Sequence, residues 1–167
     1  MENYLNDALD ILIKEENALK FDSFDNEEAW KLGCFMVDRV KKTGIDLAIC
    51  IRKTDGNIVF QYASEGTDFS NQFWMNKKFN TVMLMKTSSL RADVQWQING
   101  EKLPGEEYAG CGGGFPIRLK GDDEIKMVLT VSQLPHVDDH NFIVESLSEY
   151  LNADVEKISG DLSMVEE

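Results

Sequence analysis

The sequence is poor in the residues that mark secreted, metal-binding or membrane-spanning proteins. It has three cysteines, three prolines and two histidines among 167 residues. An odd number of cysteines without a Cys-x-x-Cys pair argues against a disulfide framework and favours a reducing compartment. The histidines, cysteines and carboxylates do not recur at a spacing typical of a zinc site. No apolar run approaches the roughly 18 residues that span a bilayer, so we expect a cytoplasmic protein with no membrane partner.

Basic residues are also scarce. There are 17 lysines and arginines against 30 acidic residues, which gives a formal net charge of −13. Such a chain repels phosphate backbones, so nucleic acid is not an expected partner. The acid is partly concentrated in Glu15–Glu16 and in the segment Asp161–Glu167, and an acidic tail of this kind is usually solvated.

In other respects the composition is that of one folded domain. Hydrophobic residues make up 43% and charged residues 28% of the chain, close to the averages for globular proteins. The length is sufficient to bury a core without disulfides. We expect a peripheral helix in residues 1–20, a single domain in residues 21–152 and an acidic tail in residues 153–167.

Apolar residues at helical spacing predict four helices. The clearest begins at Asp25, an N-cap residue with Glu28 three positions later to complete a capping box, and it ends at Gly44. The other three are expected over residues 4–20, over residues 71–86, and from a cap at Asp138 or Asp139 to Tyr150.

Alternation and apolar runs predict the strands of an antiparallel sheet. Asp46–Arg52 is apolar on both faces, which is typical of a central strand, and Asp55-Gly56 favours a tight turn into a partner strand at Ile58–Ala63. Leu90–Ile98 alternates apolar and polar residues and predicts a strand with one solvated face. A second hairpin is expected from residues 115–119 and 126–134. The fold class is therefore α+β, an antiparallel sheet of about five strands flanked by amphipathic helices.

A glycine-rich loop of about fifteen residues, 99–113, precedes the second hairpin, and loops of this length in compact domains are often functional. It runs into Gly112, Gly113 and Gly114, and a strand is expected from Phe115. The N–H groups of these glycines could bind an anion, because glycine lets the main chain approach closely. The alternative is a tight turn into the strand.

Two lysines stand out against the acidic background. On the helix expected over residues 71–86, Lys77 lies opposite the apolar face and Lys78 flanks it, so the two side chains diverge. Beside Ser88 and Ser89, the lysines could hold a carboxylate or phosphate by charge-assisted hydrogen bonds. The alternative is that they only solvate the helix.

Histidine and cysteine supply the remaining candidates. His140 is expected in the first turn of the last helix, where the helix dipole disfavours the charged ring; a neutral imidazole could accept a proton or ligate haem iron. The alternative is a satisfied histidine beside a capping Asp139. Cys111, in the glycine-rich loop, could ligate haem or act as a nucleophile. No acid–base pair defines a reaction, so the sequence does not decide whether the protein is an enzyme.

Several motifs resemble those of one known family. They are Phe24-Asp25-Asn26, Trp74 with Lys77-Lys78 and Ser88-Ser89-Leu90, Gly112-Gly113-Gly114-Phe115-Pro116-Ile117, and Thr130-Val131-Ser132 with Leu134-Pro135 and Asp139-His140. Together they resemble the GlcG/HbpS-like family, often labelled haem-degrading, in its small cytosolic branch found in bacteria and fungi. In that branch a histidine usually stands where this chain has Cys111, and a glycine where it has Gln133.

The resemblance implies a profilin-like fold that assembles into homo-oligomers, and it offers haem as the ligand or cofactor. We therefore expect a homo-oligomeric small-molecule-binding protein whose ligand is haem or a small anionic metabolite. Its pocket would bring together the Lys77–Ser89 segment, the glycine turn and His140. The alternative is a non-catalytic protein-interaction or assembly scaffold, which the acidic surface and the N-terminal helix favour.

Overall fold

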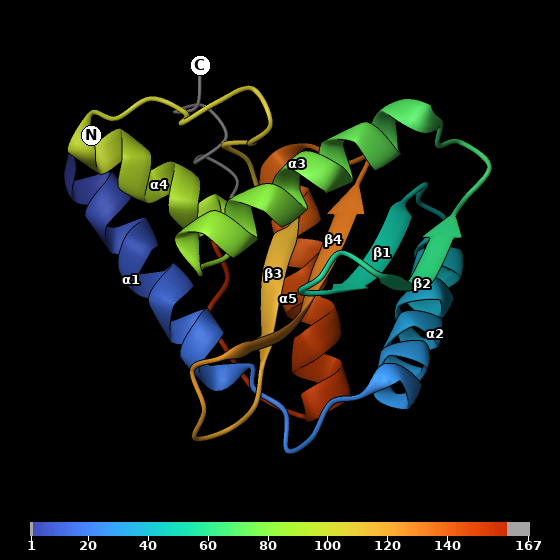
Figure 1. The fold of residues 1–167 in the computed structure, drawn as a ribbon. Coiled ribbons are helices and arrows are strands. Elements are labelled where there is room, and N and C mark those ends of the chain that lie inside the picture. The colour runs from blue at the N-terminus through green and yellow to red at the C-terminus, as the bar shows by residue number, and fades with distance from the viewer. Residues whose placement is uncertain (1, 160–167) are drawn as a thin grey trace.

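The computed structural model describes residues 2–159, which form a four-stranded antiparallel sheet and five helices (Figure 1). The strands lie in the order β2-β1-β4-β3, and each neighbouring pair is antiparallel. The α+β class is confirmed, with four strands where the sequence predicts about five. In chain order the elements are α1 (Glu2–Ala18), α2 (Asn26–Thr43), β1 (Ala48–Lys53), β2 (Ile58–Ala63), α3 (Phe69–Met85), α4 (Ser89–Asn99), β3 (Gly114–Arg118), β4 (Ile125–Ser132) and α5 (His136–Leu151).

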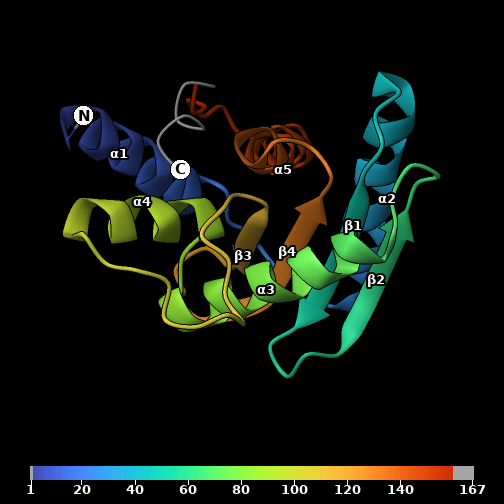
Figure 2. The same ribbon diagram turned by 90° about the horizontal axis from the view of Figure 1, so that it is seen from above.

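Helices cover both faces of the sheet (Figure 2). α2 and α5 pack on one face, where they form the main core with β1, β3 and β4. α3 crosses the other face, and its Phe79 and Val82 pack there with Val128 of β4. α4 and α1 lie side by side beyond β3. This layered arrangement places α3 and the start of α5 at the same end of β4.

The ends of α2 and the turn of the first hairpin follow the sequence signals. The Asp25 carboxylate accepts the Glu28 N–H at 2.8 Å. Gly44 ends the helix with φ of +71°, and Gly56 in the turn between β1 and β2 has φ of +95°. Glycine adopts these positive φ values without the steric penalty of a Cβ atom, so the prediction from local sequence is confirmed at both places.

The beginning of α5 differs from the prediction of a cap at Asp138 or Asp139. The helix begins at His136 and has no side-chain cap. The Asp139 carboxylate is used elsewhere, because it accepts the Leu134 N–H at 3.0 Å and forms an ion pair with a lysine of α3. With 3.6 residues to a turn, His140 therefore lies in the second turn of α5 and not in the first.

α4 is the largest departure from the sequence prediction, which makes Leu90–Ile98 a strand. The segment is helical, and residues two positions apart in a helix lie on nearly opposite sides, since each residue turns by about 100°. Leu90 and Val94 pack in a cluster with α1, while Ala92 and Trp96 are buried as well. Burial on two opposite sides of a helix thus reproduces the period of two that is typical of a strand. This error also accounts for the fifth strand.

α1 packs along α4 through an apolar seam. Leu5, Ala8 and Leu12 of α1 form a cluster with apolar residues of α4, α5 and the stretch after α5. In the described range no helix is both long and apolar enough to cross a membrane. The predicted acidic segment Asp161–Glu167 lies outside the described residues.

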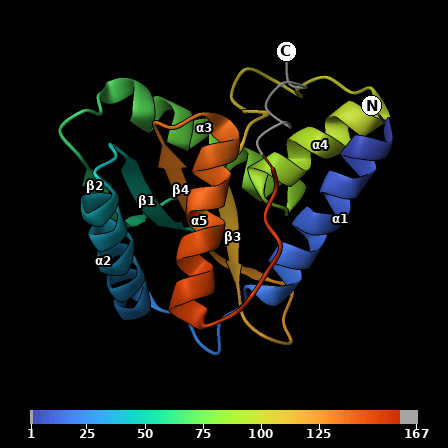
Figure 3. The same ribbon diagram turned by 180° about the vertical axis from the view of Figure 1, so that it is seen from behind.

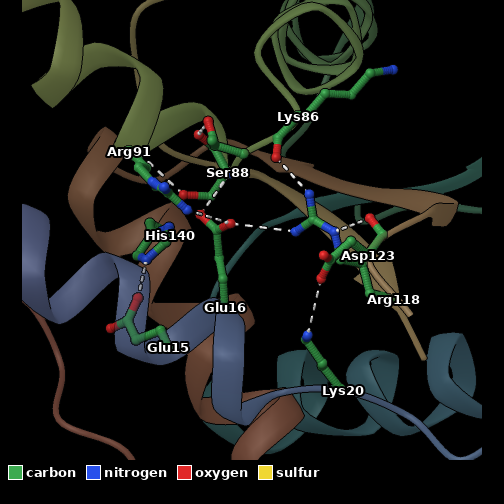
Figure 4. A network of polar contacts seen from close by, with 10 residues as sticks. Glu15, Glu16, Lys20, Lys86, Ser88, Arg91, Arg118, Asp123 and His140 are labelled. Atoms are coloured by element: carbon green, nitrogen blue, oxygen red, sulfur yellow. Dashed lines mark hydrogen bonds and ion pairs between the residues drawn. The ribbon is translucent and has the colours of Figure 1, made fainter. Parts of the chain in front are cut away.

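A buried carboxylate of α1 adds a polar contact at the junction of α1, α4 and β3 (Figure 4). Glu16 accepts the Ser88 N–H at 2.9 Å and lies 3.1 Å from Arg91 and 3.4 Å from Arg118. Its side chain is 4% exposed. A buried charge is tolerated only where opposite charges and hydrogen bonds compensate its lost hydration, so Glu16 ties α1 to two other elements.

Candidate functional site

A cleft of about 780 Å³ opens beside α3. It is lined by α3, by the segment before β3 and by the turn from β4 into α5. Small-molecule sites typically have volumes of about 300–1,000 Å³, so the cleft is of the size that such a ligand needs. Its aromatic and apolar side chains include Trp74, Leu103, Tyr108 and Leu134, and its charged side chains are Lys77, Lys78, Glu106 and Asp139.

A buried ion pair forms the floor of the cleft. Lys78 Nζ lies 3.1 Å from Asp139 Oδ2, with 4% and 3% of the two side chains exposed, and it also donates to the Val131 carbonyl at 2.9 Å. Burial raises the pKa of the Asp139 carboxyl above its ordinary value, although the Lys78 ammonium opposes the shift. The pair joins α3 to α5 beneath the space that a ligand would occupy.

The backbone is strained at one side of the cleft. Gln133, between β4 and α5, has φ of +150°, a conformation that glycine adopts far more readily than other residues. Asn71 of α3 donates to Gln133 Oε1 at 3.0 Å and to Ser132 Oγ at 3.1 Å. These bonds hold the strained turn against α3. It is the same position at which the family that the sequence resembles usually has glycine.

The mouth of the cleft carries an aromatic and basic wall. Trp74 is 43% exposed and packs edge to face with Phe73, their ring centroids 5.9 Å apart. Lys77 Nζ lies 4.6 Å from the centroid of Phe73 and 5.1 Å from that of Trp74. The ammonium is attracted by the electron-rich ring faces. A molecule entering the cleft therefore meets an exposed indole ring and a positive charge together.

The three glycines at the start of β3, Gly112 to Gly114, lie buried where α3, α4 and α5 meet. Gly112 donates its N–H to His136 Nδ1 at 3.0 Å, and Gly114 donates its N–H to Ser89 Oγ at 2.9 Å. Gly113 has φ of +119°, and a Cβ atom there would lie 2.6 Å from Lys78 Nζ. Two of the N–H groups that could bind an anion are thus taken by the protein, and the turn serves close packing.

We expect Gly113→Ala to lower the free energy of unfolding by about 2–4 kcal/mol, because a Cβ would clash with the buried ammonium and the backbone φ disfavours it. Urea unfolding followed by circular dichroism measures the change. Gly100→Ala is the matched control, since Gly100 has φ of +68° and nothing within 4 Å of its added Cβ. It carries the penalty for positive φ without the clash, so equal losses in the two variants would contradict the packing account.

The structure brings part of the predicted site together. Lys77, Lys78 and Cys111 line the cleft. The other predicted residues are buried and do not line it, namely Ser88, Ser89, Gly112, Gly113, Gly114, Phe115 and His140. The lysines, the glycine turn and the start of α5 do meet, because Gly113 lies against Lys78 and Gly112 against α5. As the helical spacing predicts, the two lysine side chains diverge, one to the mouth and one to the floor.

His140 lies in the core, between α5 and α1 (Figure 4). Its side chain is fully buried, and Nε2 lies 2.7 Å from Oε1 of Glu15, which is also buried. A ligand could reach this ring only by displacing the core segments packed around it, which include α1 and Phe115 of β3. His140 therefore serves the packing of α1 and is not placed to touch a molecule in the cleft.

Haem iron would need a donor atom in the cleft. His136 lines the cleft, but its Nδ1 accepts the Gly112 N–H. A neutral imidazole whose Nδ1 accepts carries its proton on Nε2, so that nitrogen is a donor and not a metal ligand. Cys111 also lines the cleft, and a thiolate can ligate haem iron. The residues present fit haem through Cys111. Within residues 2–159, no group of three or more His, Cys, Asp and Glu side chains could hold a metal ion.

Most of the cleft's walls carry no signal in the sequence. The length and glycine content of the loop 99–113 mark it as a candidate, and part of the loop does line the cleft. The sequence of the loop does not show which of its side chains face the cleft. The pairing of Lys78 with Asp139 joins residues 61 positions apart. One signal is present in the sequence, because no acidic residue occurs from Phe69 to Ala92. An anion is repelled least along this stretch of an acidic chain.

Asp93 of α4 lies beside the cleft residue Gly110, whose added Cβ would be 3.0 Å from Asp93 Oδ1. Burial raises the pKa of Asp93 from 3.8 to about 6, and the hydrogen bond from Gln97 opposes this shift. Between these two pH values the folded chain holds a proton that the unfolded chain has released. The contribution of Asp93 to stability therefore falls as the pH rises from about 4 to about 6 and stays low above that.

We expect Asp93→Asn to raise the free energy of unfolding at pH 7.5 by about 1–2 kcal/mol relative to the wild type, because asparagine cannot ionise. This figure allows for the partial exposure of the side chain. At pH 4 the two proteins should differ little. Urea unfolding at both pH values gives the comparison, with the exposed Asp38→Asn on α2 as the control. A variant less stable than the wild type at pH 7.5 would contradict the account.

The sheet, the helices on both its faces and the cleft define an α+β fold with a cleft of small-molecule size. The chain belongs to the HbpS-like family. The family model described as haem degrading protein HbpS-like matches residues 24–148, so the resemblance drawn from the motifs is confirmed.

Relatives and solved structures agree with this assignment. A UPF0303 protein of Yersinia pseudotuberculosis serotype O:3 (strain YPIII) is 34% identical over 151 residues, which cover 87% of each chain. The crystal structure of the Ybr137w protein is similar with a TM-score of 0.78 and 28% identity, over 86% of this chain and 87% of that one. A structure described as a PduOC:haem complex shares the fold, with a TM-score of 0.63 and 15% identity over 81% of this chain and 99% of that chain.

Proposed function

We propose that this member of the HbpS-like family is a small-molecule-binding protein whose ligand occupies the cleft beside α3. The observation that carries the proposal is the mouth of the cleft, where Lys77 lies over the rings of Phe73 and Trp74 while Trp74 remains 43% exposed. A planar, anionic molecule suits this wall, because its flat part can stack on the indole ring and its acidic group can pair with the ammonium.

Haem combines both features, since it has a flat ring system and acidic side groups. The family description and the haem complex of a protein with the same fold support haem as the first ligand to test. Cys111 is the cleft residue that would hold the iron, which would supply any redox chemistry. Lys77 would pair with an acidic group. A smaller anionic metabolite would use Lys77 and Trp74 in the same way and leave Cys111 without a role.

Titration of the purified protein with haemin tests the haem version. We expect a saturable Soret shift at one equivalent. Trp74→Ala should weaken binding about tenfold, which is about 1.4 kcal/mol, and Cys111→Ala should change the Soret maximum because the iron loses its thiolate. Trp30→Ala and Cys34→Ala are matched controls, since both residues are exposed on α2. Unsaturable haemin binding, or losses of haemin affinity equal to those of the control variants, would rule out this site for haem.

Thermal shifts test the smaller anions. A ligand that binds only the folded state raises the melting temperature as its concentration rises, so phosphate and a set of aromatic carboxylates can be screened directly. We expect Lys77→Ala to abolish the shift and the exposed Lys41→Ala on α2 to leave it unchanged. If Lys77→Ala retains the full shift, the ligand binds elsewhere.

A second candidate function is assembly, and the outer surface of α3 favours it. Phe69 is 81% exposed and Phe73 46% exposed, one turn apart on this helix. We propose that this surface packs against a second copy of the chain. Exposed apolar side chains that lie together often mark a protein–protein contact, and the absence of acid from Phe69 to Ala92 lowers the repulsion between two copies that each carry −13.

Light scattering after gel filtration tests the assembly. We expect Phe69→Glu to lower the molar mass of the particle, because a carboxylate would be buried in the contact. Asn6→Glu, which adds the same charge to an exposed position on α1, is the control. A monomeric wild type, or an unchanged mass for Phe69→Glu, would contradict the contact through α3.

A further inference from the structure

The turn from β4 into α5 passes beside α3 (Figure 3), and it contains the strained residue Gln133. The φ of this residue is +150°, and its exposed side chain lines the cleft. Glycine would adopt such a backbone conformation more readily than glutamine does. Residues held in strained conformations are concentrated at binding and active sites. The strain therefore points to a role for the glutamine side chain in the cleft.

The capping box of α3 fixes the orientation of this side chain. Asn71 accepts the Asp68 N–H through Oδ1 at 2.9 Å, so its amide nitrogen faces the other way. That nitrogen donates to Ser132 Oγ at 3.1 Å and to Gln133 Oε1 at 3.0 Å. Because the oxygen of the Gln133 amide is engaged by Asn71, the group that Gln133 can offer to a ligand is its NH₂, which is a donor only.

The amide nitrogen of Gln133 is available for this purpose. It donates to no residue in the described range 2–159. The adjacent Leu134 N–H donates to Asp139, but that carboxylate is buried and paired with Lys78. An acceptor group that binds at Gln133 would therefore not meet an unpaired negative charge beneath it.

Gln133 and Lys77 lie at separate points along α3. Gln133 is held by Asn71, which precedes Lys77 by six positions, and six residues of helix span about 9 Å along the axis. Trp74 lies midway between these two positions, and it is 43% exposed. The α3 side of the cleft thus offers an amide donor, an indole ring and an ammonium group in this order.

We propose that Gln133 determines the specificity of the cleft, because it donates an N–H to the end of the ligand opposite the group that pairs with Lys77. This inference rests on the proposed function, since it assumes that a planar anion lies on Trp74. A carboxylate is the acceptor that such a donor binds most strongly, because hydrogen bonds to charged groups are the stronger ones. The ligand class is therefore an elongated planar molecule with an acidic group at each end.

Isothermal titration calorimetry of the full-length protein with three biphenyl probes tests the proposal. All three carry a carboxylate at one end, and the other end carries a hydrogen atom, a second carboxylate or a carboxamide. We expect the wild type to bind the dicarboxylate about tenfold more tightly than the monocarboxylate, which is the effect of one hydrogen bond to a charged group. Lys77→Ala should weaken the binding of all three probes, because their shared carboxylate loses its partner.

Gln133→Glu keeps the shape of the side chain and an oxygen for Asn71, but it replaces the donor with a second carboxylate oxygen. We expect this variant to bind the dicarboxylate about tenfold more weakly than the wild type does. It should bind the carboxamide probe at least as tightly, because a carboxamide can donate to the new oxygen. A role in folding alone would weaken the binding of all three probes equally. Gln61→Glu, the same change at an exposed position of β2, is the control and should leave the three affinities unchanged.

Gln133→Gly removes the donor and the backbone strain together. We expect it to bind the monocarboxylate as the wild type does and to lose the preference for the dicarboxylate. Its melting temperature should exceed that of Gln133→Ala, which keeps the unfavourable φ without the side chain. A preference for the dicarboxylate that survives in Gln133→Gly would overturn the proposal.

The calorimetry also separates this inference from the proposed function. If the wild type binds the dicarboxylate and the monocarboxylate equally and through Lys77, Gln133 does not determine specificity and the proposed function stands. The same conclusion follows if Gln133→Glu leaves the ratio of the three affinities unchanged. If no probe binds, or if binding does not depend on Lys77, the proposed function fails and this inference fails with it.

Discussion

Lys78→Met is expected to lower the free energy of unfolding by about 3–5 kcal/mol, because removing one partner of a buried ion pair leaves the other charge uncompensated. Asp139 would lose its contact at 3.1 Å, and the Val131 carbonyl would lose a donor at 2.9 Å. Methionine has a similar length and no charge, so the loss reports the electrostatic contact more than a cavity. Urea unfolding at pH 7.5 is the measurement.

The double variant Lys78→Met, Asp139→Asn distinguishes the loss of the ion pair from the cost of leaving the Asp139 carboxylate buried without a partner. The asparagine oxygen can still accept the Leu134 N–H, which Asp139 accepts at 3.0 Å, so we expect the double variant to recover most of the stability lost in Lys78→Met. Lys77→Met is the neighbouring control and should change stability by no more than about 0.5 kcal/mol. A double variant less stable than Lys78→Met would contradict this account, because Asp139 would then stabilise the fold even without Lys78.

Glu16→Ala is also expected to lower the free energy of unfolding by about 3–5 kcal/mol, because it leaves two arginines without their shared carboxylate. Arg91 and Arg118 lie 3.1 and 3.4 Å from Glu16, and the Ser88 N–H at the start of α4 would lose its acceptor. The loss should appear first as loosening of α1. Hydrogen exchange measured by mass spectrometry should therefore show faster exchange in α1 at denaturant concentrations where the sheet is still protected.

Two variants on the same helix sharpen this result. Glu16→Gln keeps an oxygen for the Ser88 N–H but removes the charge, so its loss should lie between that of Glu16→Ala and zero. Asp10→Ala removes an exposed carboxylate from α1 and should change stability by about 0.5 kcal/mol or less. If Glu16→Ala behaves like Asp10→Ala, α1 is held by its apolar seam alone.

Lys77 and Lys78 show how neighbouring residues divide between binding and stability. Lys78 is 3% exposed and holds the floor of the cleft together, so its replacement would damage the fold whether or not a ligand exists. Lys77 reaches the mouth, where it touches Phe73 and Trp74. Only Lys77 can report on ligand binding without a change in folding. Replacing both together, the natural choice from sequence, would confuse the two effects.

Much of the fold could be predicted because its signals are local. Asp25, Glu28 and Gly44 set the ends of α2, since a carboxylate three residues before an N–H and a residue free to adopt positive φ act within one turn. Asp55-Gly56 marks the first hairpin for the same reason. The motifs around the glycine turn indicate the family, and the match over residues 24–148 confirms it.

The site could be predicted only in part. Lys77, Lys78, Cys111 and the glycine turn were recognisable, and they do meet near the cleft. His140 was placed in the site because the sequence gives its helix but not the neighbours of that helix, and in the fold Glu15 of α1 covers it. The nearby sequence determines whether a residue lies in a helix, whereas the exposure of that residue depends on which distant segment packs against it.

By itself the sequence determined the α+β class, the antiparallel hairpins, the family and the acid-free stretch along α3. Only the tertiary structure decided that Leu90–Ile98 is helical, that Glu16 is buried, and that Lys78 pairs with Asp139 to form a floor. The physical reason is common to all three. Hydrophobic periodicity records which residues are buried but not what buries them, and the free energy that selects among the alternatives comes from contacts between segments far apart in the chain.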